Sequence, residues 1–329
     1  MSLLKHPKAQ ALLAEAELTA TSVRGCAERV TGFIQRYLPL LGRKEQHQHA
    51  LVVVQGRLSN LERKTSEPIA YLAGQERKPV QNFVGAGAWD DEAIMAELRR
   101  HVRDELADAD AVLVLDPCSF PKKGTQSCGV DRQWCGRLGK LDNCQVGVFW
   151  GYASAKGRAL VDRRLYLTKD SAKDRKQRQK CHVPKEVKFQ EKWRIGLERL
   201  QLLSAELAHG WIAADDEFGR VAEFRAALRQ RRERYVVDVP SNTLVREVAE
   251  HSAAHGKTPF VGVAAWAAQQ PAARWQKLRV RAGTKGELVV RALTALVQTK
   301  DEDGCVGAAE QVVVIRNVAG EPQTWYALS

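Results

Sequence analysis

The segment AVLVL, residues 111–115, is a short unbroken apolar run that ends on a single acid, Asp116, with Pro117 directly after it. An apolar run of this length is typical of a strand that is buried on both faces of a sheet. Asp-Pro is also a common start of a turn, so Asp116 has a purely structural interpretation as well. The elements that follow decide between the two.

Strand and helix patterns alternate after this run. Two alternating segments around the turn signal SAKGR predict a hairpin, and apolar side chains at steps of three and four predict a helix after it. A strand that ends in acids, a second helix and a further strand follow. The expected elements are strands at 111–115, 145–152 and 159–167, a helix at 186–210, a strand at 211–219, a helix at 220–235 and a strand at 235–241.

This order is that of an RNase H-like α/β fold, in which helices flank a mixed sheet. The first and fourth strands of that fold are parallel neighbours, so their carboxyl ends meet at one edge of the sheet. Asp116 and Asp215 follow those two ends. Because adjacent carboxylates repel each other unless a divalent cation lies between them, the order predicts a metal site. Asp216 is the alternative to Asp215, and the alternation of side chains along a strand favours Asp215.

The flanking regions differ from this core. Residues 1–108 have helical spacing and predict a helical N-terminal domain that binds DNA, whereas 242–329 predict a β-rich insertion into a core at 109–241. Four of the seven cysteines lie between 118 and 144, but without a CxxC pair, so neither a zinc site nor a disulfide framework is expected.

The chain is basic, with 51 Lys and Arg against 39 Asp and Glu, a formal net charge of +12. This excess favours a polyanionic partner such as nucleic acid. Residues 169–194 hold ten Lys or Arg against four acids, which indicates either contact with a nucleic-acid backbone or a solvated charged connection. The chain has no apolar run long enough for a membrane span or signal peptide, so a cytoplasmic, nucleoid-associated protein is expected.

The segment LVLDPCSFPKKG, residues 113–124, resembles the first catalytic block of bacterial insertion-sequence transposases of the DDE superfamily. The resemblance continues in order through AADDEFGR and YVVDVPSNT. It extends upstream through LERKTSEPIAYLAG and downstream to WQKLRVRAGTKGE. It implies metal-dependent strand cleavage and strand transfer at terminal inverted repeats, by a homodimer that holds inverted-repeat and target DNA in a synaptic complex. It also implies two Mg²⁺ or Mn²⁺ ions, with Asp116 between them and Asp215 on one of them. Basic residues near this block are candidates for contact with DNA: Lys122, Lys123, Arg132 and Lys140.

Two departures from the family pattern affect these expectations. Where such enzymes commonly carry a second acid, Thr and Gly after the first Asp, this chain has Pro117, Cys118 and Ser119. A third acid, a Glu on a helix after the β-rich insertion, is not found. Glu217 lies too near Asp215 in the chain, and Glu310 is expected to open a strand.

The sequence therefore predicts a transposase that is truncated or split at its C-terminus, and the chain alone is not expected to nick its own inverted repeats. The alternative is a catalytically inactive DNA-end-binding protein or transposition inhibitor. An RNase H-like nuclease that acts on RNA is disfavoured by the helical N-terminal region and the β-rich insertion.

Overall fold

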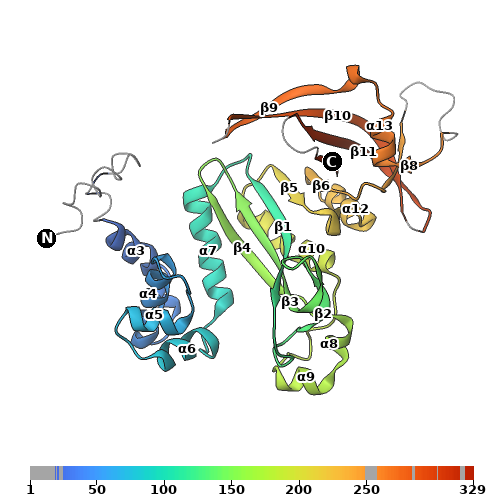
Figure 1. Ribbon diagram of the computed structural model, residues 1–329. Helices are drawn as coiled ribbons and strands as arrows, with labels where there is room; N and C mark the ends of the chain where they lie inside the picture. The colour runs from blue at the N-terminus through green and yellow to red at the C-terminus, as the bar shows by residue number, and fades with distance from the viewer. Residues whose placement is uncertain are drawn as a thin grey trace. The chain divides into compact units, whose positions relative to one another are not determined.

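The computed structural model describes residues 19, 21, 25–248, 258–283, 286–301, 303–318 and 323–329. The chain divides into two compact units, Met1–Arg100 and His101–Ser329 (Figure 1). Each unit is described by itself. Among the described helices, none combines the length and the apolar character that crossing a membrane requires.

The first unit is built from helices, as the spacing of its apolar residues predicts. Gly56 of α4 is in close contact with Ile69 of α5, since a Cβ at Gly56 would lie 2.5 Å from a side-chain carbon of Ile69. The buried core includes Ile34, Tyr37 and Val80. Its helices are α3 (Cys26–Gln35), η2 (Leu38–Leu40), α4 (Lys44–Leu58), α5 (Ser66–Leu72), α6 (Arg77–Gly85) and α7 (Asp91–Leu106), the last of which continues into the second unit.

The second unit contains one mixed sheet of twelve described strands, in the order β2-β3-β1-β5-β6-β12-β11-β10-β7-β8, with β4 paired to β3 and β9 to β10. The strands are β1 (Val112–Pro121), β2 (Asp131–Cys135), β3 (Lys140–Ala153), β4 (Arg158–Leu165), β5 (Trp211–Ala214), β6 (Tyr235–Asp238), β7 (Leu244–Glu247), β8 (Val261–Gly262), β9 (Gln276–Gly283), β10 (Gly286–Lys300), β11 (Val306–Asn317) and β12 (Thr324–Leu328). The helices are α8 (Lys169–Lys173), α9 (Arg175–Lys180), α10 (Lys192–Glu206), α11 (Asp216–Gly219), α12 (Ala222–Gln230), α13 (Val263–Ala268) and η3 (Ala272–Arg274).

The centre of this sheet has the predicted RNase H-like arrangement. β1 runs antiparallel to β3 and parallel to β5, and β5 runs parallel to β6. Helix α10 packs on β1 and β3, because the indole of Trp150 donates to the carbonyl of Gly196 at 3.2 Å and a Cβ at Gly196 would lie 2.6 Å from Leu115. The α/β fold class with flanking helices is thus confirmed.

Several element bounds differ from the prediction. β1 does not end at Asp116; it continues to Pro121 along β3, while its parallel pairing with β5 stops at Leu115. Beyond that point β1 has lost one neighbour, and proline is tolerated in a strand where no ladder partner needs its N–H. The strand expected at 211–219 ends at Ala214, and the helix expected from 186 begins at Lys192.

No element was predicted between the strands expected at 111–115 and 145–152, so β2 was missed. It pairs with the first part of β3, from Asp131↔Cys144 to Cys135↔Lys140. At the other side of the core, β12 pairs with β6, so the sheet continues from the core into strands of 242–329. The predicted boundaries at 108 and 241 stay predictions.

Candidate active site

Asp116 and Asp215 occupy matching places on neighbouring parallel strands. The last pair in the register of β1 and β5 is Leu115↔Ala214, and each aspartate is the next residue of its chain segment. The two acids that the sequence places at one edge of the sheet are therefore neighbours there. β1 carries Asp116 onward in extended backbone, whereas the chain turns into α11 directly after Asp215.

Asp215 is the N-cap of α11. Its carboxylate accepts a hydrogen bond from the backbone N–H of Glu217 at 3.1 Å, which satisfies one of the free donors at the start of that helix. The end of α11 lies against β6, because a Cβ on Gly219 would be 1.9 Å from the carbonyl oxygen of Asp238. The short helix α11 is thus held at its start by the Asp215 cap and at its end by its contact with β6, which fixes the position of Asp215.

The acids at this edge repel one another. The pKa of Asp215 is raised to about 6, first by burial and then by the charges of Glu217, Asp116 and Asp216. The pKa of Asp116 is also raised, by partial burial and by Glu217, although its side chain reaches the surface. Burial and the charge of Asp216 raise the pKa of Asp238. Such shifts mean that the edge favours either a bound proton or a nearby cation.

The residues at this edge fit a divalent cation in part. Aspartate oxygens are the ligands that Mg²⁺ and Mn²⁺ prefer, and a cation would offset the burial and the neighbouring negative charges that together raise the pKa of Asp215. Within the described residues, however, no three or more His, Cys, Asp or Glu side chains form a group that could hold a metal ion. The edge thus provides two suitable carboxylates, Asp116 and Asp215.

The other acids considered in the sequence have different partners. Asp216 forms an ion pair with Arg220 at 2.9 Å and is about half exposed. Glu217 forms an ion pair with Lys192, with its oxygen 2.6 Å from Nζ. Sequence spacing did not predict this pair, because it depends on where α10 begins.

Glu310 is buried inside β11 rather than at its start. Its carboxylate lies 2.9 Å from Arg225 and 2.6 Å from Arg229, and it accepts a hydrogen bond from the hydroxyl of Tyr235 at 2.6 Å. The expectation that Glu310 opens a strand was wrong, since β11 begins at Val306. Its carboxylate is engaged in a buried ion-pair cluster.

The predicted DNA-contacting residues lie on the loop after β1, on β2 and at the start of β3. Lys122 and Lys123 follow β1 in a loop held by Asn143, whose side-chain amide donates to the carbonyls of Lys122 and Gly124 at 2.7 and 3.0 Å. Arg132 is exposed on β2. Lys140 at the start of β3 pairs with Asp142 at 3.1 Å, so part of its charge is already compensated.

A hollow of about 500 Å³ lies beside the acidic edge. Glu217 lines it together with the aromatic rings of Tyr166, Phe189 and Trp193. Lys192 also lines it and lies over the ring of Tyr166, 5.2 Å from its centroid. The edge therefore opens next to a surface with both cationic and aromatic groups.

A family model and a described relative both match the sequence of this chain. The family model described as "DDE superfamily endonuclease" matches residues 36–300. The chain is also 32% identical over 94 residues to a protein of Microchaete diplosiphon described as "Probable transposase for insertion sequence element IS701". That match spans 28% of this chain and 25% of the relative, so the chain aligns with about a quarter of the relative's length. Because the family model spans most of the sequence, the chain belongs to the DDE superfamily of endonucleases.

Proposed function

We propose that this protein is an insertion-sequence transposase, which cleaves DNA at terminal inverted repeats and transfers the freed strand to target DNA. The observation that carries the proposal is the pair of neighbouring carboxylates, Asp116 and Asp215, which directly follow the last residue pair of β1 with β5. The family match and the similarity to a probable transposase support it. A homodimer that holds two DNA ends is part of the proposal.

Asp116 and Asp215 would hold divalent cations in this proposal. When bound, such ions activate the attacking oxygen and stabilise the leaving oxygen of a phosphodiester. Asp215 is oriented for this role by its hydrogen bond from the N–H of Glu217. Glu217 forms its ion pair with Lys192, and we do not assign it as a metal ligand. Its negative charge is close enough to raise the pKa of both aspartates.

The family chemistry uses three acids, and Asp116 and Asp215 are the two that we assign. We therefore expect cleavage by this chain alone to be strongly impaired. The same observation favours the second candidate function, a DNA-end-binding protein or transposition inhibitor that keeps the fold without the chemistry. The two candidates differ in whether a bound cation leads to strand cleavage.

The test combines metal binding with nicking. The chain is incubated with Mg²⁺ or Mn²⁺ and a supercoiled plasmid that carries the DNA flanking its gene, and thermal unfolding is followed with and without the ion. Asp116→Asn and Asp215→Asn should lose the stabilisation by metal, whereas the matched control Asp216→Asn should keep it.

The outcomes separate the two functions. Slow nicking that disappears in Asp116→Asn supports the transposase, whereas DNA binding without nicking supports the binding protein. Nicking that is vigorous in the wild type and lost in Asp116→Asn would show that two carboxylates suffice. Nicking or metal stabilisation that survives in both aspartate variants would contradict the assigned site.

A further inference from the structure

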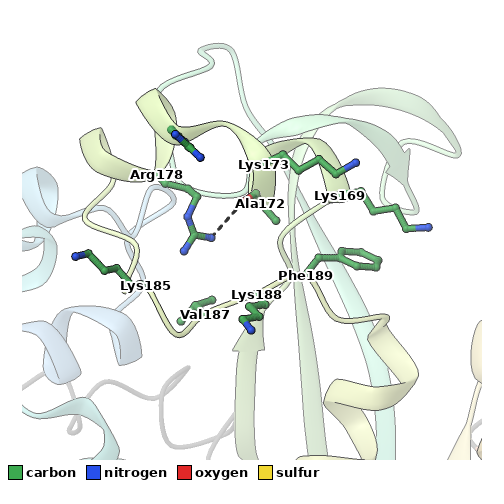
Figure 2. Close-up of a pocket in the computed structure, with 9 residues that line it drawn as sticks. Lys169, Ala172, Lys173, Arg178, Lys185, Val187, Lys188 and Phe189 are labelled. Carbon is green, nitrogen blue, oxygen red and sulfur yellow. Dashed lines mark hydrogen bonds between the residues drawn. The ribbon is translucent and has the colours of Figure 1, made fainter.

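A second hollow, of about 660 Å³, lies between α8, α9 and the segment that leads to α10 (Figure 2). We call it the basic pocket. No Asp or Glu lines it, and its other lining residues are Ala172, Val187 and Phe189. Its cations are Lys169, Lys173, Arg175, Arg178, Lys185 and Lys188.

The cations of the basic pocket lack acidic partners. None of the six forms an ion pair with any residue that the structure describes. Five of the six are exposed, so an external ligand can reach them. Some cations elsewhere in the unit are paired, as are Arg199 with Asp162 and Lys192 with Glu217. Six like charges around one hollow repel each other, and an anionic ligand with several charges would relieve that repulsion.

Hydrogen bonds hold the walls of the basic pocket in place. The guanidinium of Arg178 donates to the carbonyl of Pro184 at 2.8 Å and to that of Ala172 at 3.4 Å, which ties α9 to both neighbouring segments. The carboxylate of Asp174 accepts hydrogen bonds from the backbone N–H groups of Lys176 and Gln177 and so caps α9, and it does not line the pocket. Hydrogen bonds therefore fix the backbone segments that carry the cations of the basic pocket.

The same frame is joined to the loop after β1. Gln177 of α9 donates to the carbonyl of Thr125 at 3.3 Å, and the thiol of Cys181 donates to that of Gln126 at 3.5 Å. Lys180 also bonds to the side chain of Gln126. These hydrogen bonds connect the basic pocket to the loop that contains Lys122 and Lys123.

The basic pocket also borders the hollow beside the acidic edge. Lys169 and Phe189 line both hollows, and Glu217 lines the one nearer to Asp116 and Asp215. Lys and Arg side chains thus continue along the surface from the basic pocket to the hollow beside the two aspartates. A polymer with one negative charge per unit matches such a surface better than a single small anion does.

We propose that the basic pocket binds the phosphodiester backbone of DNA that flanks the phosphate cut at Asp116 and Asp215. This inference rests on the proposed function for the identity of the polymer. Contacts of Lys and Arg with phosphates position a nucleic acid without reading its sequence, so the basic pocket supplies affinity and register.

The test is a salt titration of DNA binding by the full chain, with EDTA present so that no cleavage is needed. The variant Lys173→Gln/Arg175→Gln/Lys185→Gln removes three pocket charges and leaves Arg178, which ties the pocket walls together. The matched control Arg158→Gln/Lys277→Gln/Arg291→Gln removes three exposed charges that do not line the pocket. Both triple variants lower the formal net charge from +12 by three. Fluorescence anisotropy with a labelled duplex gives the affinity, and thermal unfolding checks that both variants fold.

The pocket variant should show a salt slope smaller by about 2.7 than that of the wild type, at roughly 0.9 per lost phosphate contact. Between about 50 and 200 mM salt its loss of affinity should therefore be about 40-fold smaller than that of the wild type. The control should keep the wild-type slope. A pocket variant with the slope of the control, or a wild type that binds no DNA, would overturn the inference.

The two proposals can fail separately. DNA binding that depends on the pocket, in a protein that metal ions do not stabilise through Asp116 and Asp215, would leave the pocket's role in DNA binding standing and count against the proposed catalytic site. Metal-dependent nicking in a protein whose pocket variant binds like the control would do the reverse.

Discussion

Gly219 is a position in α11 that lies very close to the backbone of the sheet. A Cβ there would lie 1.9 Å from the carbonyl oxygen of Asp238, a fixed backbone atom that cannot move aside as a flexible side chain can. We expect Gly219→Ala to lower the free energy of unfolding by about 1–3 kcal/mol, the usual cost of overpacking. Urea unfolding followed by circular dichroism measures it.

The matched control for this change is Gly85→Ala. Gly85 ends α6, and a Cβ there would meet no atom within 4 Å. Its substitution should change stability by less than about 0.5 kcal/mol. If Gly219→Ala and Gly85→Ala were equally stable, the close approach of α11 to β6 would be wrong.

Asp215 gives the protein a pH dependence that can be measured without metal. Its pKa is about 6 instead of 3.8, so between these values the folded state binds more protons than the unfolded state. The contribution of Asp215 to stability is therefore full below about pH 4 and is lost as pH rises through 6. Asn can still cap α11 but carries no charge. In EDTA, we expect Asp215→Asn to match the wild type at pH 4 and to exceed it by about 1–3 kcal/mol at pH 7.

Chemical unfolding at several pH values checks this expectation. The comparison with Asp215→Asn cancels the titration of groups that the variant shares with the wild type, apart from those that Asp215 itself perturbs. A stability difference that stayed constant from pH 4 to pH 7 would contradict the raised pKa of Asp215.

At the scale of elements, a buried ion-pair cluster joins β11 to α12 and β6. Arg225 and Glu310 are 3% and 2% exposed, and Arg225 also donates to the hydroxyl of Thr299 on β10. Removing one partner leaves the other charge buried without compensation, which typically costs about 3–5 kcal/mol. We expect Glu310→Ala to lose stability by about that amount in equilibrium unfolding.

The double variant Arg225→Met/Glu310→Leu tests the cause of that loss. Because it removes both charges, it should be less destabilised than the sum of the two single variants. Additive losses would show that packing, and not the ion pair, determines the stability of this junction.

The elements also show what the sequence could predict. The unbroken apolar run of β1 and the regular apolar spacing of β3, β4 and α10 are strong signals, and all four elements were predicted. β2 has only five residues and two charges, so its alternation is weak against its loop-like surroundings. The extension of β1 past Pro117 depends on its pairing with β3, a tertiary contact that local propensity does not contain.

The same distinction applies to the candidate site. The adjacency of Asp116 and Asp215 follows from strand order, which can be deduced from the order of elements along the chain. The pair of Glu217 with Lys192 and the pocket formed by α8, α9 and the segment before α10 depend on short helices whose start residues the sequence does not define. Charge density alone indicated 169–194 as a basic segment, but not that its cations surround one hollow.

At the scale of the whole molecule, the second unit has the features of an independent domain. All described strands lie in one sheet within His101–Ser329, and the core of that sheet includes Leu113, Trp150 and Ile212. A unit with its own hydrophobic core can in principle fold alone. The division at Arg100 cuts through α7, of which only His101–Leu106 would remain.

We therefore expect the fragment His101–Ser329 to fold by itself, with a fraying first turn and a cooperative unfolding transition. The matched control is the fragment from Asp131 to Ser329, which also lacks β1 and so deprives β3 and β5 of the strand between them. Circular dichroism and urea unfolding should show a cooperative transition for the longer fragment and none for the shorter one, because an open gap in the middle of a sheet leaves two rows of backbone groups unpaired. If both fragments lacked a transition while the full chain unfolded cooperatively, the second unit would need the first for its stability, and the chain would be one folding unit instead of two.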